Sequence, residues 1–168
     1  MRWTILALLS ALLLPAHAAA QCRLCAEGGT LTGEEAPAVP VQLELETTLD
    51  FDKLILTGPA GGVARLGPDG SRLTSGAIEA LSARAMIGEL LIRGEPGRSI
   101  RVTMPERIEL FGPSGGSLSI QRLASDLPPS PRLDGNGRLR VRFGGELAVS
   151  GDAEGDYRGD IAITVDYL

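Results

Sequence analysis

The chain has 168 residues, of which 43% are hydrophobic, 22% are charged and 4% are aromatic, and its formal net charge is −5. This apolar content excludes a wholly disordered protein, and the acidic balance argues against nucleic acid as a partner, because phosphate binding needs a basic face. The only histidine and the only tryptophan, His17 and Trp3, lie near the N-terminus in an apolar leader. The rest of the chain therefore lacks the imidazole of Ser-His and Cys-His catalysis, and we expect a non-catalytic protein with no cofactor and no metal.

Residues 1–20 have the pattern of a signal peptide. Arg2 supplies positive charge, an apolar run extends from Ile5 to Leu14, and Pro15 and two Ala-x-Ala sequences end it. The run is too short to cross a hydrocarbon core about 30 Å thick, and no longer apolar run follows. We therefore expect an exported protein without a transmembrane span, located in the periplasm, on the cell surface or outside the cell.

Residues 21–40 are predicted to form an extended N-terminal arm. Cys22 and Cys25 begin it, and two neighbouring cysteines in an oxidising compartment are expected to form a local disulfide. Haem attachment is disfavoured because Ala26, not His, follows the second cysteine, and a redox pair is disfavoured because no helix follows. Pairing between chains, or a metal shared by two chains, stays open. The arm is either a plain spacer or a segment that adds a strand to the open edge of a neighbour.

Residues 41–168 are predicted to form one β-sandwich, because apolar residues alternate with polar ones in several short runs. The alternating apolar positions are Val41, Leu43 and Leu45; Ile100, Val102 and Met104; Leu139, Val141 and Phe143; and Ile161, Ile163, Val165 and Tyr167. Clusters of glycine, proline, aspartate and asparagine separate these runs and indicate turns. Residues 76–92 have some helical propensity, but Gly88 interrupts them and we predict two strands there. About nine or ten antiparallel strands result, and the last alternation is predicted to face the core.

Two charged clusters could carry chemistry. Four carboxylates fall in one glycine-containing loop: Asp152, Glu154, Asp156 and Asp160. They could bind calcium, but the spacing of a calcium loop is not met, and a solvated hairpin loop is the favoured interpretation. Three arginines share one face of a predicted strand: Arg138, Arg140 and Arg142. They could contact an anionic polysaccharide or lipid headgroup, although a solvated strand face that resists edge-to-edge pairing is the more ordinary interpretation.

The C-terminal third contains a GGxLxV…GxYxG…TVxY pattern, formed by Gly144, Gly145, Gly155, Tyr157, Gly159 and Tyr167. From the residue types alone, Gly144-Gly145 is predicted to make a tight reversal of the chain. Tyr157 is predicted to bury its ring and to form a hydrogen bond to the backbone through its hydroxyl. Together with residues 49–51, 75–78, 94–97 and 100–105, the pattern resembles the bacterial domain-of-unknown-function 4402 family. The resemblance covers about residues 47–168. It implies an immunoglobulin-like sandwich similar to fimbrial subunits, and it supplies no catalytic residues.

These features favour an exported structural or adhesive surface subunit of pilus-like type. Its expected partners are other copies of itself or related surface subunits. The alternative is a monomeric periplasmic binding module for a carbohydrate or another small ligand.

Overall fold

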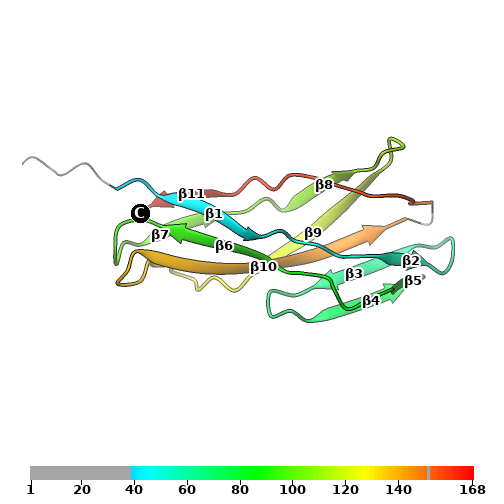
Figure 1. Ribbon diagram of the computed structural model, residues 1–168, viewed down its shortest axis with the longest axis horizontal. Coiled ribbons are helices and arrows are strands. Elements are labelled where there is room, and N and C mark those ends of the chain that lie inside the picture. Colours follow the sequence, from blue (N-terminus) through cyan, green and yellow to red (C-terminus); the bar gives the residue numbers. More distant parts are fainter. Residues whose placement is uncertain (1–38, 151) are drawn as a thin grey trace, which may run out of the picture. The chain divides into compact units, whose positions relative to one another are not determined.

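The computed structural model describes residues 39–150 and 152–168, which form an all-β antiparallel domain (Figure 1). The predicted signal peptide, most of the arm, and both Cys22 and Cys25 lie outside the described residues. Within the described part no helix is long and apolar enough to cross a membrane. The predicted all-β sandwich is confirmed, and the described residues form eleven strands instead of the nine or ten expected.

The strands in chain order are β1 (Gln42–Thr47), β2 (Leu54–Leu56), β3 (Gly62–Leu66), β4 (Arg72–Gly76), β5 (Ile78–Ala80), β6 (Gly88–Arg93), β7 (Ile100–Thr103), β8 (Arg107–Phe111), β9 (Ser117–Ser125), β10 (Arg138–Val149) and β11 (Thr164–Tyr167). The large sheet has the order β1-β6-β10-β3-β4, with β9 also paired to β10 and β8 paired to β9. Two small sheets, β11-β7 and β2-β5, complete the domain. Residues 76–92 contain β5 and most of β6 and no helix, as predicted.

Strand β10 is twelve residues long and joins two halves of the core, because its first part pairs with β6 and its second part with β3 and β9. One core cluster lies between the β6-β10 region and the small β7-β11 sheet. Its buried members are Leu90, Ile92, Ile100, Leu133, Val141 and Phe143. Ile161, Ile163, Val165 and Tyr167 pack against this cluster, whereas Thr164 and Asp166 are exposed. The predicted register of the last strand is therefore confirmed.

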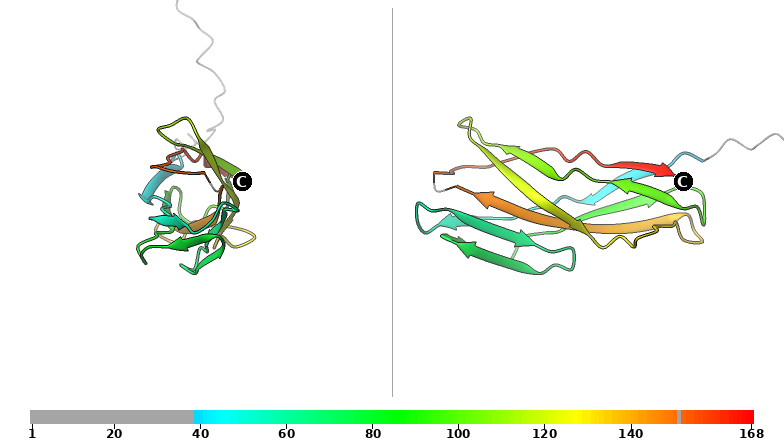
Figure 2. Two further views of the ribbon diagram at one scale, coloured as in Figure 1. Left: turned by 90° about the vertical axis from the view of Figure 1, so that its right-hand side faces the viewer. Right: turned by 180° about the vertical axis from the view of Figure 1, so that it is seen from behind.

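The second core cluster lies on β3, β5, β8, β9 and β10. Its buried members are Ala64, Ile78, Ile108, Leu118, Ile120 and Leu147. The layer opposite this cluster is thin, because β2 and β5 have three residues each and the chain from 152 to 163 has no regular strand. Figure 2 shows this irregular stretch running beside β8 before it enters β11. This half of the sandwich is therefore less completely covered than the other.

Gly144 and Gly145 do not make the predicted reversal, because both lie inside β10. A Cβ atom on Gly144 would collide with the Leu66 carbonyl oxygen, and one on Gly145 would come within 2.7 Å of the Ile120 side chain. The β9-β10 register also shifts between Gly144 and Glu146. Glycine within a strand commonly marks a bulge or a close approach of neighbouring backbone. The pair thus allows β3 and β9 to approach β10 closely.

The alternation in β1 does not bury its apolar face as predicted. Leu43 and Leu45 stand opposite Ile92 and Leu90 of β6, so they lie on the core side of the sheet. They are nevertheless 43% and 49% exposed, because β1 is the edge strand of its sheet. A strand at an edge has a neighbouring strand on one side only. The opposite layer of the sandwich does not cover Leu43 and Leu45 completely.

Candidate functional site

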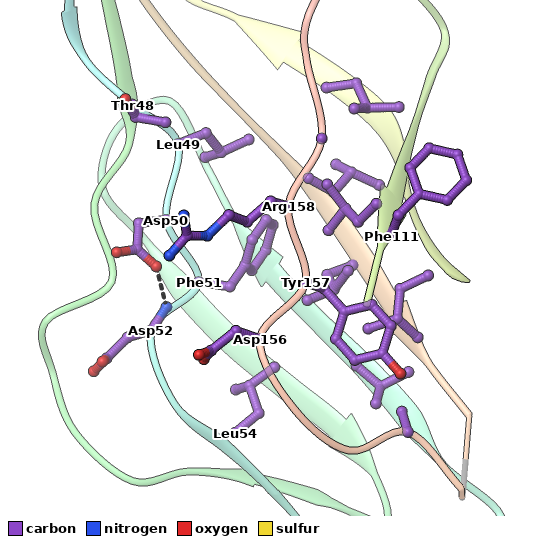
Figure 3. Close-up of a pocket in the computed structure, with 18 of the residues that line it drawn as sticks. Thr48, Leu49, Asp50, Phe51, Asp52, Leu54, Phe111, Asp156, Tyr157 and Arg158 are labelled. Atoms are coloured by element: carbon purple, nitrogen blue, oxygen red, sulfur yellow. Dashed lines mark hydrogen bonds between the residues drawn. The ribbon is translucent and has the colours of Figure 1, made fainter. Parts of the chain in front are cut away.

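A cavity of about 1230 Å³ lies over the second core cluster, and we call it the open groove (Figure 3). Its floor consists of Ile108, Leu118, Ile120, Phe143 and Leu147. Residues 48–52 and 54–56, from the connection between β1 and β2 and from β2 itself, form the first wall. Residues 152–161, which lead toward β11, form the second wall. The groove therefore lies where the thin layer of the sandwich leaves the sheet incompletely covered.

The exposed apolar surface of the open groove belongs to its sides, not to its floor. The floor side chains are at most 8% exposed, so the core beneath the groove is closed. By contrast Ile55, Met86 and Phe111 are 42%, 48% and 66% exposed. A molecule that entered the groove would therefore bury apolar surface mainly against the walls and the rim, without displacing the core.

The first wall is irregular because the chain turns sharply after β1. The Asp52 N–H donates a hydrogen bond of 2.7 Å to Asp50 Oδ1, which is the pattern of an Asx turn. Asp52 adopts a positive φ of 56°, which a regular strand does not contain. Asp50 makes an isolated antiparallel bridge with Met86. The first wall is thus fixed by the bridge at Asp50 and, further along, by the pairing of β2 with β5, whereas residues 51–53 between these two points are not in a strand.

The second wall is held against the β8-β9 hairpin by a short series of contacts. Arg158 and Phe111 exchange two backbone hydrogen bonds of 3.1 and 2.8 Å. Gly155 has a φ of 101°, and a Cβ on Gly159 would collide with the Glu109 carbonyl oxygen. The ring of Tyr157 fits against the hairpin turn, where a Cβ on Gly112 would come within 2.8 Å of it. The glycines at 155 and 159 therefore let this segment lie close to β8.

Tyr157 is half-buried and lines the open groove. The sequence predicts a hydrogen bond from the Tyr157 hydroxyl to the backbone. Among the described residues this hydroxyl makes no hydrogen bond, so that prediction finds no support there. Its ring packs with the second core cluster, together with Leu110 and Ile161. Tyr157 thus belongs to the candidate site through its ring.

Both walls carry backbone groups that lack protein partners within the described residues. No backbone hydrogen bond involves residues 159–162 there, and the same holds for Thr48, Leu49 and Phe51. Gly159, Asp160 and Ala162 are exposed, so water can satisfy these groups in the isolated chain. Unpaired backbone N–H and C=O groups along an extended segment can instead pair with another strand.

The open groove is strongly acidic around its opening. Six carboxylates line it, namely those of Asp50, Asp52, Asp152, Glu154, Asp156 and Asp160. Arg158 is the single basic side chain among the residues of this lining, and Figure 3 shows it lying between the two walls. A hydrogen bond donated by the Ser82 hydroxyl lowers the pKa of Asp52 further below neutral pH. Within the described residues no three acidic, histidine or cysteine side chains converge as a metal site would require.

Tyr167 lies at the far end of β11 and does not line the open groove. Its hydroxyl accepts a hydrogen bond of 2.7 Å from the Glu95 N–H and donates one of 2.9 Å to the Val39 carbonyl. The Arg98 guanidinium lies 4.9 Å from the centre of its ring. The Val39 N–H also donates to a Glu95 carboxylate oxygen at 3.2 Å. Tyr167 therefore ties Val39, just ahead of β1, to the turn that follows β6.

The arginines of β10 face carboxylates rather than open solvent alone. Arg140 pairs with Glu46 at 3.1 Å, and Arg142 pairs with Asp126 at 2.9 Å. Arg138 lies on the same strand, where its backbone N–H donates to Asp134. The surface of this sheet is thus of mixed charge, which weakens the interpretation of the arginines as a site for an anionic polymer.

Sequence patterns identified the second wall in part but missed the first. The acidic loop and the Gly-x-Tyr-x-Gly segment both fall in the second wall, although neither was expected to line a cavity. The first wall gave one local signal, which is the end of the alternation after Leu45. Its position opposite residues 152–161 depends on which distant segments become neighbours in the fold, and no local pattern in the sequence reports that.

Fold and site together define an antiparallel β-sandwich with a groove between two segments that are only partly paired with their neighbours. A family model described as Domain of unknown function (DUF4402) matches residues 41–167, and the chain belongs to this family. No curated protein and no solved structure shows a significant match to the chain.

Proposed function

We propose that this protein is an exported, non-catalytic structural or adhesive subunit of the bacterial cell surface that binds another polypeptide in its open groove. The observation that carries the proposal is the groove itself. It combines a cavity that has an apolar floor with two wall segments, and several backbone groups of each wall, at residues 48, 49, 51 and 159–162, make no backbone hydrogen bond in the described chain.

The physical basis is the addition of a strand to a sheet edge. An extended peptide in the groove would gain backbone hydrogen bonds from the walls, and its alternate side chains would enter the cavity. It would also cover exposed apolar side chains such as Ile55 and Phe111. Burial of apolar surface contributes roughly 25 cal/mol per Å², so covering these side chains favours association.

Export is supported by the leader sequence, and a role between proteins is supported by what the groove offers. The groove presents apolar walls, carboxylates and free backbone groups. These groups suit recognition of a chain, and the resemblance to fimbrial-type sandwiches is consistent with a partner that is another surface subunit or a second copy.

A periplasmic binding module for a small ligand is the second candidate, because the groove has an apolar floor and a few polar groups, as small-molecule sites do. Its volume of about 1230 Å³ lies above the range of roughly 300–1,000 Å³ typical of such sites. The size therefore favours the polypeptide.

Photo-crosslinking in the cells that export the protein tests the proposal. A photoreactive amino acid at Phe111 lies at the groove, and one at Leu73 in β4 is a matched control, because the two side chains are 66% and 65% exposed. We expect a covalent complex with another polypeptide, in the cell-surface fraction, from position 111 and not from position 73. A periplasmic monomer without crosslinks from either position would contradict the proposal.

A further inference from the structure

We propose that the occupant of the open groove is a basic, alternately apolar strand supplied by a different chain, and not the acidic N-terminal arm of another copy. This inference rests on the proposed function and specifies the chemistry of the partner segment. Three observations carry it: the shape of the groove, the charge around it, and the sequence of the arm.

The shape of the groove fits an extended chain. Its two walls come from different parts of the sequence, and each includes residues whose backbone groups have no partner among the described residues. A strand rises about 3.3 Å per residue, and its side chains alternate between the two faces. An added strand would therefore direct every second side chain to the cavity and the others to the solvent near the rim.

The charge around the groove determines which outward-facing side chains of the bound strand are favourable. Six carboxylates and one guanidinium line the groove, and they come from both walls. In the second wall Asp152, Glu154, Asp156 and Asp160 are all exposed, and the described ion pairs of the domain include none of them. Opposite charges on two partners steer their association and suppress wrong partners, whereas like charges placed together oppose it. Lysine or arginine at the outward positions of the strand would be favoured.

The arm of this chain has the wrong charge and the wrong pattern for the groove. Between residues 21 and 38 it contains one basic residue, Arg23, and three acidic ones, Glu27, Glu34 and Glu35. Its large aliphatic side chains are limited to two leucines, and glycine and proline interrupt the segment. Such a segment would bring negative charge to an acidic rim and would fill few alternate positions, so the arm does not suit the groove.

Three synthetic peptides, each with the same neutral dye, test this inference by fluorescence anisotropy with the exported form of the protein. The first peptide, KVTVKVTVK, combines alternate valines with lysines, and the second, EVTVEVTVE, reverses the charge. The third copies residues 21–38 with serine in place of both cysteines. We expect the lysine peptide to bind at least about tenfold more tightly than the other two. Raising the salt concentration tenfold shortens the screening length about threefold and should weaken this binding.

Matched variants of the protein locate the binding. Glu154→Gln, Asp156→Asn and Asp160→Asn together remove three charges from the groove, and Glu79→Gln, Glu106→Gln and Asp166→Asn remove three exposed charges outside its lining. We expect the first triple variant to weaken binding of the lysine peptide about tenfold and the second to change it by less than about twofold.

Other outcomes would overturn the inference in distinguishable ways. Tighter binding of the arm peptide than of the lysine peptide would make the arm the occupant, and the proposed function would survive. Equal binding of the lysine and glutamate peptides, or equal effects of the two triple variants, would show that charge at the groove does not select the partner. Failure of all three peptides to bind would also overturn it, whereas the crosslinking at Phe111 would still decide the proposed function.

Discussion

Tyr167 shows how one side chain can join two distant parts of the chain. Its hydroxyl links the Glu95 N–H, in the turn after β6, to the Val39 carbonyl at the entry of the domain. The ring packs at the edge of the first core cluster and under the Arg98 guanidinium. The alternation in the sequence predicted that this ring faces inward, but the partners of the hydroxyl come from elsewhere in the chain.

Tyr167→Phe should keep the packing of the ring and remove both hydrogen bonds. A net contribution of about 0.5–1.5 kcal/mol per hydrogen bond predicts a loss of about 1–3 kcal/mol in the free energy of unfolding. Tyr157→Phe is the matched control, and it should cost less than about 0.5 kcal/mol, because no partner of its hydroxyl is found in the described region. Urea denaturation of both variants measures the difference. A larger loss for Tyr157→Phe would show that the roles of the two tyrosines are misassigned.

Gly144 should tolerate no side chain, because a Cβ atom there would collide with the Leu66 carbonyl oxygen of β3. Gly144→Ala must push two paired strands apart, and we expect it to destabilise the domain by about 2–3 kcal/mol. Gly135→Ala is the control, since nothing lies within 4 Å of the added atom, and it should change stability by less than about 0.5 kcal/mol. Thermal unfolding of both variants is the measurement. A Gly144→Ala protein as stable as the control would mean that β3 and β10 are not in contact at this position.

At the scale of single elements, β11 is the strand that its sequence describes best. Val165 packs against the first core cluster, and Thr164 is exposed beside Thr103 of β7. Val165→Asp would place a carboxylate in an apolar environment, which we expect to cost about 2–4 kcal/mol of a total stability of about 5–15 kcal/mol. Thr164→Asp, one residue away, should cost less than about 1 kcal/mol. Chemical denaturation of the two variants tests the register of β11. A larger loss of stability in Thr164→Asp than in Val165→Asp would mean that the opposite face of the strand points to the core.

Other elements show where local patterns stop being informative. The alternation in β1 is as regular as that in β11, yet Leu43 and Leu45 remain about half exposed because β1 lies at an edge. The Gly144-Gly145 pair has the composition of a turn but lies within a strand, where close neighbours require it. Period and composition describe one segment at a time, whereas burial and glycine contacts depend on which segments become neighbours.

At the scale of the whole domain, the class of fold could be predicted from the sequence and the open groove could not. Turn signals and alternation indicate many short antiparallel strands, and these lead to a sandwich. The groove arises because the layer over one half of the core consists of two three-residue strands and an irregular segment. That outcome depends on which segments residues 48–56 and 152–161 each come to lie beside, β5 and Met86 for the first and β8 for the second, and no local pattern reports it.

The central claim is that another polypeptide completes this half of the sandwich, and amide hydrogen exchange at residues 159–162 tests it most directly. In the purified, unassembled protein these amides should exchange fast, because no backbone hydrogen bond involves them within the described chain. In the protein isolated in the proposed complex with its partner chain, we expect their exchange to slow by about tenfold or more, as an added strand pairs with them. Amides of β10 that are paired to β6 serve as the internal control and should be protected in both forms. Equally fast exchange at 159–162 in both forms would contradict the claim.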